Sequence, residues 1–417
     1  MARTAAWPQE EVSFFEKDAA DLISKGFLTD DRFKALMEGD AVAAKAEVRQ
    51  QLKAQQADAI RGALAKQPTD QILQADIIAA AAGGLWGAAS AWLKTTPILK
   101  PPTSPPQSTA KVETPPIPVT SQLWNSAKEA ALKSMETNRK IRTVDFFELS
   151  HFCGDELTCD HVIIAINGFM THGYSPSVNW EAICRKKNVA CYIVLWEAGN
   201  AAEWDAFCNE TNKHLETGED DTIATHFTVG NPWNKAQNKA HQVGICLAEI
   251  LISKPVFVRG RKITLVGHSL GSVVIESALQ HLSTHNGNVN NAPVHLHQVA
   301  FFAAAFVPEH DFSKIADTVF PRDGPPFRLL NVYSPQDHIL LHLFSLINMH
   351  IQRPAAGCFP INSKVVRNID VSDLVPSNDK SLLGHSYEPF MDAVVARIGD
   401  LLALPDAVEP AKTDEGQ

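Results

Sequence analysis

The chain has 417 residues, 45% of them hydrophobic and 20% charged, which is enough for one large domain or two medium ones with a sizeable core. The formal net charge is -10 at pH 7 and no stretch is strongly basic, so nucleic acid is not an expected partner. The seven cysteines are scattered and form no CxxC pair, which indicates reduced thiols rather than a zinc ribbon or a redox motif.

Residues 1–94 are predicted to form a helical N-terminal module. Positions 9–66 are rich in Ala, Glu, Lys and Gln, and their apolar residues recur at helical spacing. Two or three amphipathic helices are expected, of the kind that pack on each other or on a protein partner. The first residues include acids where a signal peptide needs an apolar core. We therefore expect a cytoplasmic protein, or one delivered without a classical signal peptide.

An uncharged stretch, residues 77–93, ends this module. Its length is at the lower limit for crossing a bilayer, and much of it is alanine. Trp86 and Trp92 suit a membrane interface. Two interpretations stay open: a buried or interfacial helix, the latter giving peripheral membrane contact, and a helix that spans the membrane.

Eight prolines between Pro97 and Pro118 define the clearest boundary in the chain. Such density favours extended, solvated backbone, so residues 95–120 are predicted to be a linker. The linker separates the helical module from a domain predicted over 121–405. Residues 406–417 are predicted to be a disordered tail.

Within that domain, short apolar runs alternate with amphipathic segments. The runs rich in β-branched or aromatic residues predict strands at 161–169, 190–199, 261–269, 296–306 and 327–334. Helical patterns cover 234–253 and 271–285. Strands that alternate with helices predict a mainly parallel sheet covered on both faces, so the expected fold class is α/β.

The segment KITLVGHSLGSVVI places Ser269 between two glycines at the end of an apolar run. A strand, a G-H-S-L-G turn and a helix are the context that a nucleophile elbow requires. The helix N-terminus beneath such a turn favours negative charge, because its first N–H groups lack helical partners. This context predicts that Ser269 is a catalytic nucleophile. An ordinary turn between strand and helix is the structural alternative.

A serine hydroxyl needs a base to take its proton, and in this type of fold the acid and the base follow the serine in the chain. Asp337 in PQDHIL follows a predicted strand, and His385 in GHSYE precedes a final amphipathic segment. Strand ends carry the site in open α/β sheets, so these two are the predicted acid and base. Asp370 and Asp373 are alternatives for the acid. The alternatives for the base are His268, His338, His342 and His350.

An acyl-transfer site also needs N–H donors for a developing oxyanion. The predicted donors are the backbone N–H groups of Leu270, directly after the serine, and of Phe169, which follows Gly168 in AINGFMTHG. Met170 is the alternative to Phe169, and a plain glycine turn is the alternative for the segment. His295 and His297 in VHLHQ have the spacing of a metal pair, but nothing completes a ligand set. We therefore expect no metal and no organic cofactor.

The segments around these residues resemble a known family. In chain order they are NPWNKAQNKAHQVGICLAEIL, ITLVGHSLGSVVIESAL, VAFFAAAFVP, LLNVYSPQDHIL, VRNIDVSDLV and GHSYE. They cover about Asp160 to Tyr387 and are similar to membrane-associated serine hydrolases, a family that includes the eukaryotic transmembrane and coiled-coil domain hydrolases. The resemblance implies an α/β-hydrolase fold of the GHSLG lipase and esterase type. It also implies Ser269, Asp337 and His385 as a triad, and hydrolysis of carboxylic esters, lipids included.

One segment departs from that family's pattern. The family carries a long apolar insertion between the VLWEAG strand and the NPW segment. In this chain the corresponding region, residues 200–230, is short and polar. Membrane attachment through such an insertion is therefore not expected. Either residues 77–93 replace it, or the substrate is soluble.

The leading hypothesis is a serine ester hydrolase that forms an acyl-enzyme, with a lipid or phospholipid ester as the favoured substrate. A second hypothesis is a delivered antibacterial lipase effector or an adaptor-bound protein, whose N-terminal helices bind a partner or serve loading. A third is a hydrolase-fold scaffold without activity, and the complete Ser–Asp–His set argues against it.

Overall fold

The computed structural model describes residues 41–66, 144–156, 159–172, 179–185, 187–217, 232–255, 257–344, 354–377 and 384–406. The apolar stretch 77–93, the proline-rich linker 95–120 and residues 407–417 lie outside the described residues. The domain boundaries that the sequence predicts in these regions therefore stay predictions.

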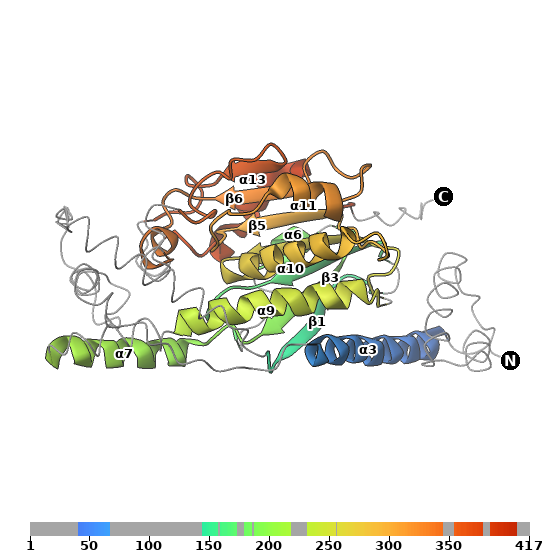
Figure 1. Ribbon diagram of the computed structural model, residues 1–417, viewed down its shortest axis with the longest axis horizontal. Helices are drawn as coiled ribbons and strands as arrows, with labels where there is room; N and C mark the ends of the chain where they lie inside the picture. The colour runs from blue at the N-terminus through green and yellow to red at the C-terminus, as the bar shows by residue number, and fades with distance from the viewer. Residues whose placement is uncertain are drawn as a thin grey trace, which may run out of the picture.

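A single sheet of seven strands forms the centre of the described structure (Figure 1). The strands are β1 (Phe147–Cys153), β2 (His161–Ile166), β3 (Ala190–Trp196), β4 (Lys262–His268), β5 (Gln298–Phe302), β6 (Leu329–Tyr333) and β7 (Val366–Asp370). Their spatial order is β1-β3-β2-β4-β5-β6-β7. Strand β1 pairs antiparallel with β3, and every other neighbouring pair is parallel.

The inner strands form because their sequences are continuous runs of residues that are buried on both faces. Every residue of β2 (HVIIAI) and of β5 (QVAFF) is buried. This pattern is typical of parallel strands covered by helices. The five strands predicted from the sequence each contain one of the strands β2 to β6. The edge strands β1 and β7 have mixed burial and more polar sequences, so they give no such run.

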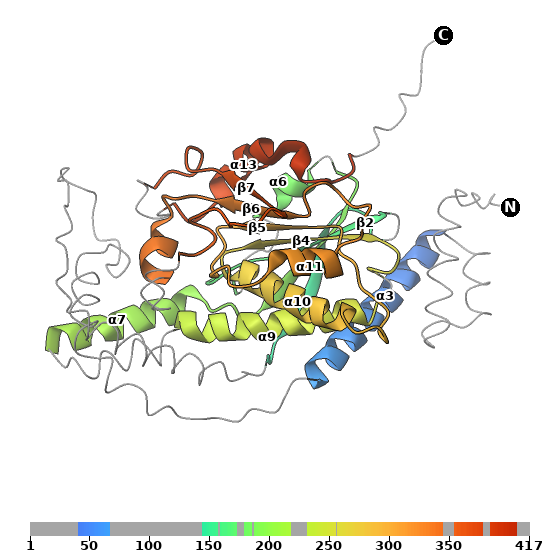
Figure 2. The same ribbon diagram turned by 45° about the horizontal axis from the view of Figure 1, so that its top comes forward.

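Helices cover both faces of the sheet, which Figure 2 shows between its two helical layers. One layer contains α9 (Pro232–Ile252), α10 (Leu270–Asn286) and α11 (Phe312–Val319), and the other contains α6 (Glu181–Cys184) and α13 (Met391–Ile398). Short helical turns occur at η2 (Ile339–Phe344), η3 (Glu388–Phe390) and η4 (Gly399–Leu401). The predicted α/β class is confirmed. The strand order, with the G-H-S-L-G turn between β4 and α10, is that of an α/β-hydrolase fold.

Helix α3 (Ala41–Ala65) belongs to the predicted N-terminal module and packs on this domain. Near its C-terminal end Ala63 is part of the main core, and Ile60 and Leu64 pack against that core. An ion pair joins Lys66 Nζ to a carboxylate oxygen of Glu249 on α9 at 2.5 Å. The two views agree that α3 lies beside α9 and β1 (Figures 1 and 2).

Helix α7 (Ala201–Thr217) occupies the segment that the sequence marks as short and polar. Trp204 and Phe207 are its buried side chains, and its other described side chains are exposed. Among the helices that the structure describes, none has both the length and the apolar character to cross a membrane.

Candidate active site

Ser269 lies between the end of β4 and the start of α10, in a backbone conformation that non-glycine residues seldom adopt. Its φ is 55° and its ψ is -121°. Such strain persists only where the surrounding structure enforces it, and it is typical of nucleophile elbows. Here the Ser269 N–H donates to the Phe302 carbonyl at 2.9 Å, and the Ser269 carbonyl accepts from the Ser272 N–H at 3.0 Å. The turn therefore holds the serine in one orientation.

The two glycines that flank Ser269 allow the turn to pack closely. A Cβ on Gly271 would lie 2.1 Å from the carbonyl oxygen of Ile166, and a Cβ on Gly267 would lie 2.7 Å from the carbonyl oxygen of Gly271. Both distances are shorter than any real Cβ contact, so neither position tolerates a side chain without a shift of the backbone. The glycines of the motif thus let α10 start directly beside strand β2.

His385 and Asp337 come to Ser269 from two later loops. The Nε2 atom of His385 is 2.9 Å from Ser269 Oγ, and its Nδ1 atom is 2.7 Å from Asp337 Oδ2. Asp337 is fully buried after β6, and its other carboxylate oxygen accepts a hydrogen bond from the Leu340 N–H at 2.9 Å. The His385 side chain is 15% exposed, so the group in contact with the serine is reachable from solvent.

The structure separates these residues from the alternatives weighed in the sequence. Asp373 forms an ion pair with Arg397 at the surface, at 2.7 Å, and Asp370 lies at the end of β7. The side chain of His342 and all of His350 lie outside the described residues. Among the described acids and histidines, the hydrogen-bonded chain from Ser269 runs through His385 to Asp337.

His268, next to the serine, contacts the backbone of the base rather than the nucleophile. Its Nε2 atom is 2.9 Å from the His385 carbonyl oxygen, which only accepts, so this nitrogen carries a proton and donates it. Burial, with a smaller contribution from the nearby His385, lowers the pKa of His268 to about 3. The imidazole is therefore neutral at pH 7 and places no positive charge beside the base.

The surroundings of Asp337 are apolar and carry neutral neighbours. Burial raises the pKa of the Tyr387 hydroxyl well above its usual value, and the Asp337 carboxylate raises it further. Burial also raises the pKa of the Cys358 thiol, and the Asp337 carboxylate raises it further. Since neither group ionises near neutral pH, neither competes with Asp337 as an anion for the His385 imidazole.

The backbone after β2 lies against the serine turn, where the sequence predicts the second oxyanion donor. A Cβ on Gly168 would lie 2.6 Å from Ser269 Cβ and 3.1 Å from the Leu270 nitrogen. The Met170 N–H donates to the Ala198 carbonyl at 2.9 Å, so the alternative donor is already engaged. Within the described residues no protein acceptor is found for the N–H groups of Phe169 and Leu270. These two remain the candidate donors.

Asn167 anchors this backbone segment, a role that the sequence analysis missed. Its side-chain oxygen accepts hydrogen bonds from Trp180 Nε1 at 2.7 Å and from Asn179 Nδ2 at 3.0 Å. The indole Nε1 of Trp196 donates to the Asn167 carbonyl at 3.1 Å. The sequence does hold a signal for this role: Asn167 is a polar residue at the end of a mostly apolar strand, and a buried amide needs hydrogen-bond partners.

His295 and His297, the possible metal pair of the sequence, do not converge on a common point. His295 is exposed, whereas His297 Nε2 donates to the Ala403 carbonyl at 3.2 Å. The His297 ring also packs edge-on against His161, with ring centroids 4.9 Å apart. Hydrogen bonding and packing account for His297 without a metal ion.

Comparison with known proteins finds similarity to a family of unknown function, to two uncharacterised membrane proteins and to one probable lipase. Residues 223–399 match the family described as "Protein of unknown function (DUF726)". An "Uncharacterized membrane protein F35D11.3" of Caenorhabditis elegans is 32% identical over 157 residues, which is 37% of this chain and 23% of that protein. A "Probable lipase MIL1" of Saccharomyces cerevisiae is 29% identical over 194 residues, 44% of this chain and 15% of that protein.

A third relative is the "Uncharacterized membrane protein C6F6.13c" of Schizosaccharomyces pombe, 29% identical over 42% of this chain and 20% of that protein. The chain thus spans less than a quarter of the length of each of these relatives. Among solved structures, the apo form of Thermogutta terrifontis esterase 2 matches 62% of this chain and 91% of its own, with 8% identity and a TM-score of 0.28. The chain is thus similar in sequence to a family of unknown function and to a yeast protein named as a probable lipase.

Proposed function

We propose that this protein is a serine hydrolase that cleaves carboxylic esters through an acyl-enzyme. The observation that carries the proposal is the hydrogen-bonded chain from Ser269 Oγ through His385 to Asp337, with contacts of 2.9 and 2.7 Å. Its location at a strained turn between strand and helix supports the same conclusion. The name of the yeast relative, a probable lipase, favours a lipid ester as substrate.

In the proposed reaction, His385 Nε2 takes the proton of Ser269 Oγ as the oxygen attacks the ester carbonyl carbon. Asp337 fixes the imidazole tautomer with the proton on Nδ1 and stabilises the imidazolium that forms. The N–H groups of Phe169 and Leu270 donate to the developing oxyanion. His385 then gives its proton to the departing alcohol, and the same imidazole activates the water that hydrolyses the acyl-enzyme.

Replacing Ser269 by Ala should abolish labelling by a fluorophosphonate probe, because such probes react with a serine whose neighbours make it nucleophilic. Hydrolysis of p-nitrophenyl esters should fall by at least about a thousandfold, the usual cost of removing the nucleophile of a triad. In-gel fluorescence of the intact chain and steady-state kinetics measure the two effects.

The matched control is Ser277→Ala, which removes another serine hydroxyl of α10, one that donates to the His241 carbonyl at 2.7 Å. This variant should be labelled like the unaltered chain. Labelling that persists in Ser269→Ala would contradict the assignment of the nucleophile. An absence of labelling in a folded, unaltered chain would contradict the proposed activity itself.

A further inference from the structure

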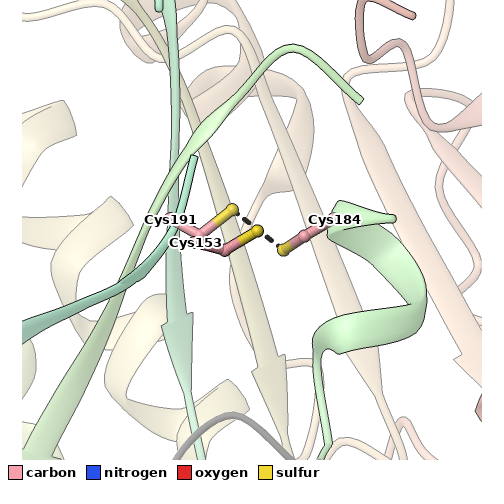
Figure 3. A group of neighbouring side chains, drawn as sticks. All are labelled: Cys153, Cys184 and Cys191. Atoms are coloured by element: carbon pink, nitrogen blue, oxygen red, sulfur yellow. Dashed lines mark hydrogen bonds between the residues drawn. The ribbon is translucent and has the colours of Figure 1, made fainter. Parts of the chain in front are cut away.

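Three cysteines that the proposed reaction does not use converge at the β1 edge of the sheet. The sulfur atoms of Cys153, Cys184 and Cys191 all lie within 4.8 Å of one another, and their side chains point toward a common centre (Figure 3). All three are free cysteines; Cys184 and Cys191 are buried and Cys153 is partly exposed. In the part of the chain that the structure describes, no other set of His, Cys, Asp or Glu ligands is grouped in this way.

A β-bulge brings Cys153 into the group. Strands β1 and β3 pair regularly as far as His151, and after an irregularity the next pair is Cys153 with Cys191. Uninterrupted pairing would have put Cys153 opposite Ala190. Directly opposed residues of an antiparallel pair carry their side chains on the same face, and bulges re-aim side chains. The bulge therefore turns the Cys153 thiol toward that of Cys191.

Two further features complete the cluster. Cys184 is the last residue of α6, and its sulfur lies 2.8 Å from that of Cys191. Gly154 has a φ of +78°, and a Cβ there would lie 1.8 Å from the Val189 carbonyl oxygen. Only glycine fits that position, so the chain turns away directly after Cys153. The thiols come from three segments that tertiary structure holds together.

We propose that Cys153, Cys184 and Cys191 bind a zinc ion as three thiolates. Sulfur ligands without carboxylates select soft ions, chiefly zinc and monovalent copper. Zinc with three thiolates has a net charge of -1, whereas monovalent copper would leave -2, and the smaller charge costs less to bury. Three protein ligands leave one tetrahedral position open for water or a small ligand.

The spacing of the sulfurs suits this coordination. A zinc–sulfur distance of about 2.3 Å in a tetrahedron separates the sulfurs by about 3.8 Å. All three separations are already below 4.8 Å, and binding requires the Cys184 and Cys191 sulfurs to move apart by about 1 Å from 2.8 Å. The short helix α6, of four residues, carries the sulfur that has to move.

Zinc binding to this cluster needs neither an oxidant nor a reductant. The zinc ion displaces three thiol protons to solvent as three zinc–sulfur bonds form, with no change of oxidation state. A disulfide between Cys184 and Cys191 would instead need a two-electron oxidant, and both residues are free cysteines in this structure.

Cobalt(II) titration of the full chain tests the proposal, after reduction and removal of metal with a chelator. We expect one cobalt ion per chain, a sulfur-to-cobalt charge-transfer band and the visible bands of tetrahedral cobalt, all bleached by one equivalent of zinc. Cys184→Ser should lose these bands. The matched control is Cys246→Ser, a buried cysteine of α9 far from the cluster in sequence, and it should retain them.

Cys153→Ser provides a second test, because its partly exposed side chain is the one whose replacement least disturbs folding. Zinc should raise the Tm of the unaltered chain and of Cys246→Ser. The apparent affinity of zinc for Cys153→Ser should be at least about tenfold weaker than for the unaltered chain, because one ligand is lost. Equal zinc affinity in Cys153→Ser, the absence of thiolate bands in the reduced chain, or a Cys184–Cys191 disulfide that excludes zinc would each overturn the proposal.

Discussion

At the scale of single residues, His385 is held at three points. Its ring contacts Asp337 at 2.7 Å and Ser269 at 2.9 Å, and its carbonyl oxygen accepts a hydrogen bond from His268 at 2.9 Å. The third contact involves no reacting atom. It fixes the backbone of the loop that carries the imidazole, so His268 is a positioning residue for the proposed base.

Replacing His268 by Leu should lower kcat for ester hydrolysis by about 2- to 10-fold and leave KM nearly unchanged, since one net hydrogen bond contributes about 0.5–1.5 kcal/mol. His268→Gln keeps an N–H donor at a similar distance from the backbone and should stay close to the unaltered rate. Kinetics with a p-nitrophenyl ester distinguish the two variants. Equal losses in both would mean that the ring itself, rather than its hydrogen bond, is required.

At the scale of elements, the site depends on how closely α10 approaches β2. Gly271, in the first turn of α10, packs directly on the Ile166 carbonyl at the end of β2. Gly62 is also helical, in α3, but a Cβ there would meet nothing within 4 Å. The two glycines therefore differ in surroundings while sharing helical backbone.

We expect Gly271→Ala to lower the free energy of unfolding by at least about 1–3 kcal/mol, because the new Cβ forces a backbone shift. Ester hydrolysis should fall with it, since Ser269 lies in the same turn. Gly62→Ala should raise the free energy of unfolding by about 0.5–1 kcal/mol through helix propensity alone. Urea unfolding measures both changes; a Gly271→Ala chain as stable as the parent would refute the close approach.

At the scale of the whole molecule, buried neutral histidines connect stability to pH. Burial, followed by the nearby His297, lowers the pKa of His161 to about 3, and burial does the same for His268. Between pH 3 and their ordinary pKa near 6.5, the unfolded chain binds these protons and the folded chain does not. The free energy of unfolding therefore decreases as the pH falls below 6.5.

Each of the two histidines should contribute up to about 1.4 kcal/mol per pH unit to that decrease. Urea unfolding at a series of pH values between 7 and 4 measures the slope. His161→Gln removes one titrating group, keeps a partner for the Thr264 hydroxyl, and should give a shallower slope. His295→Gln changes an exposed histidine and serves as the control; the same slope in His161→Gln as in the control would contradict the assignment.

The contacts of α3 lead to a prediction about the N-terminal region. A fragment from Ser121 onward lacks the core contacts of Ala63 and Leu64 and the ion pair between Lys66 and Glu249. It should keep ester hydrolysis, since the candidate site lies in the later residues, but its Tm should be several degrees lower. Differential scanning calorimetry and an ester assay test both parts, and a folded but inactive fragment would mean that the N-terminal region takes part in catalysis.

The sequence by itself determined the features that depend on local pattern. Strands β2 to β6 each contain a run of buried, mostly apolar residues, and the two glycines of the G-H-S-L-G turn are four positions apart. Both features can therefore be predicted from the local sequence alone. The edge strands β1 and β7 cannot, because they bury only part of their surface and their pairing depends on a neighbour elsewhere in the chain.

Only the tertiary structure decided which distant groups meet. It selected Asp337 over Asp370 as the partner of His385, and it engaged the Met170 N–H with Ala198 so that Phe169 remains the candidate donor. It also gathered three cysteines that share no sequence motif, through a bulge that shifts the register of one strand. Local sequence encodes a turn or a strand, whereas a contact between loops depends on the packing of every element between them.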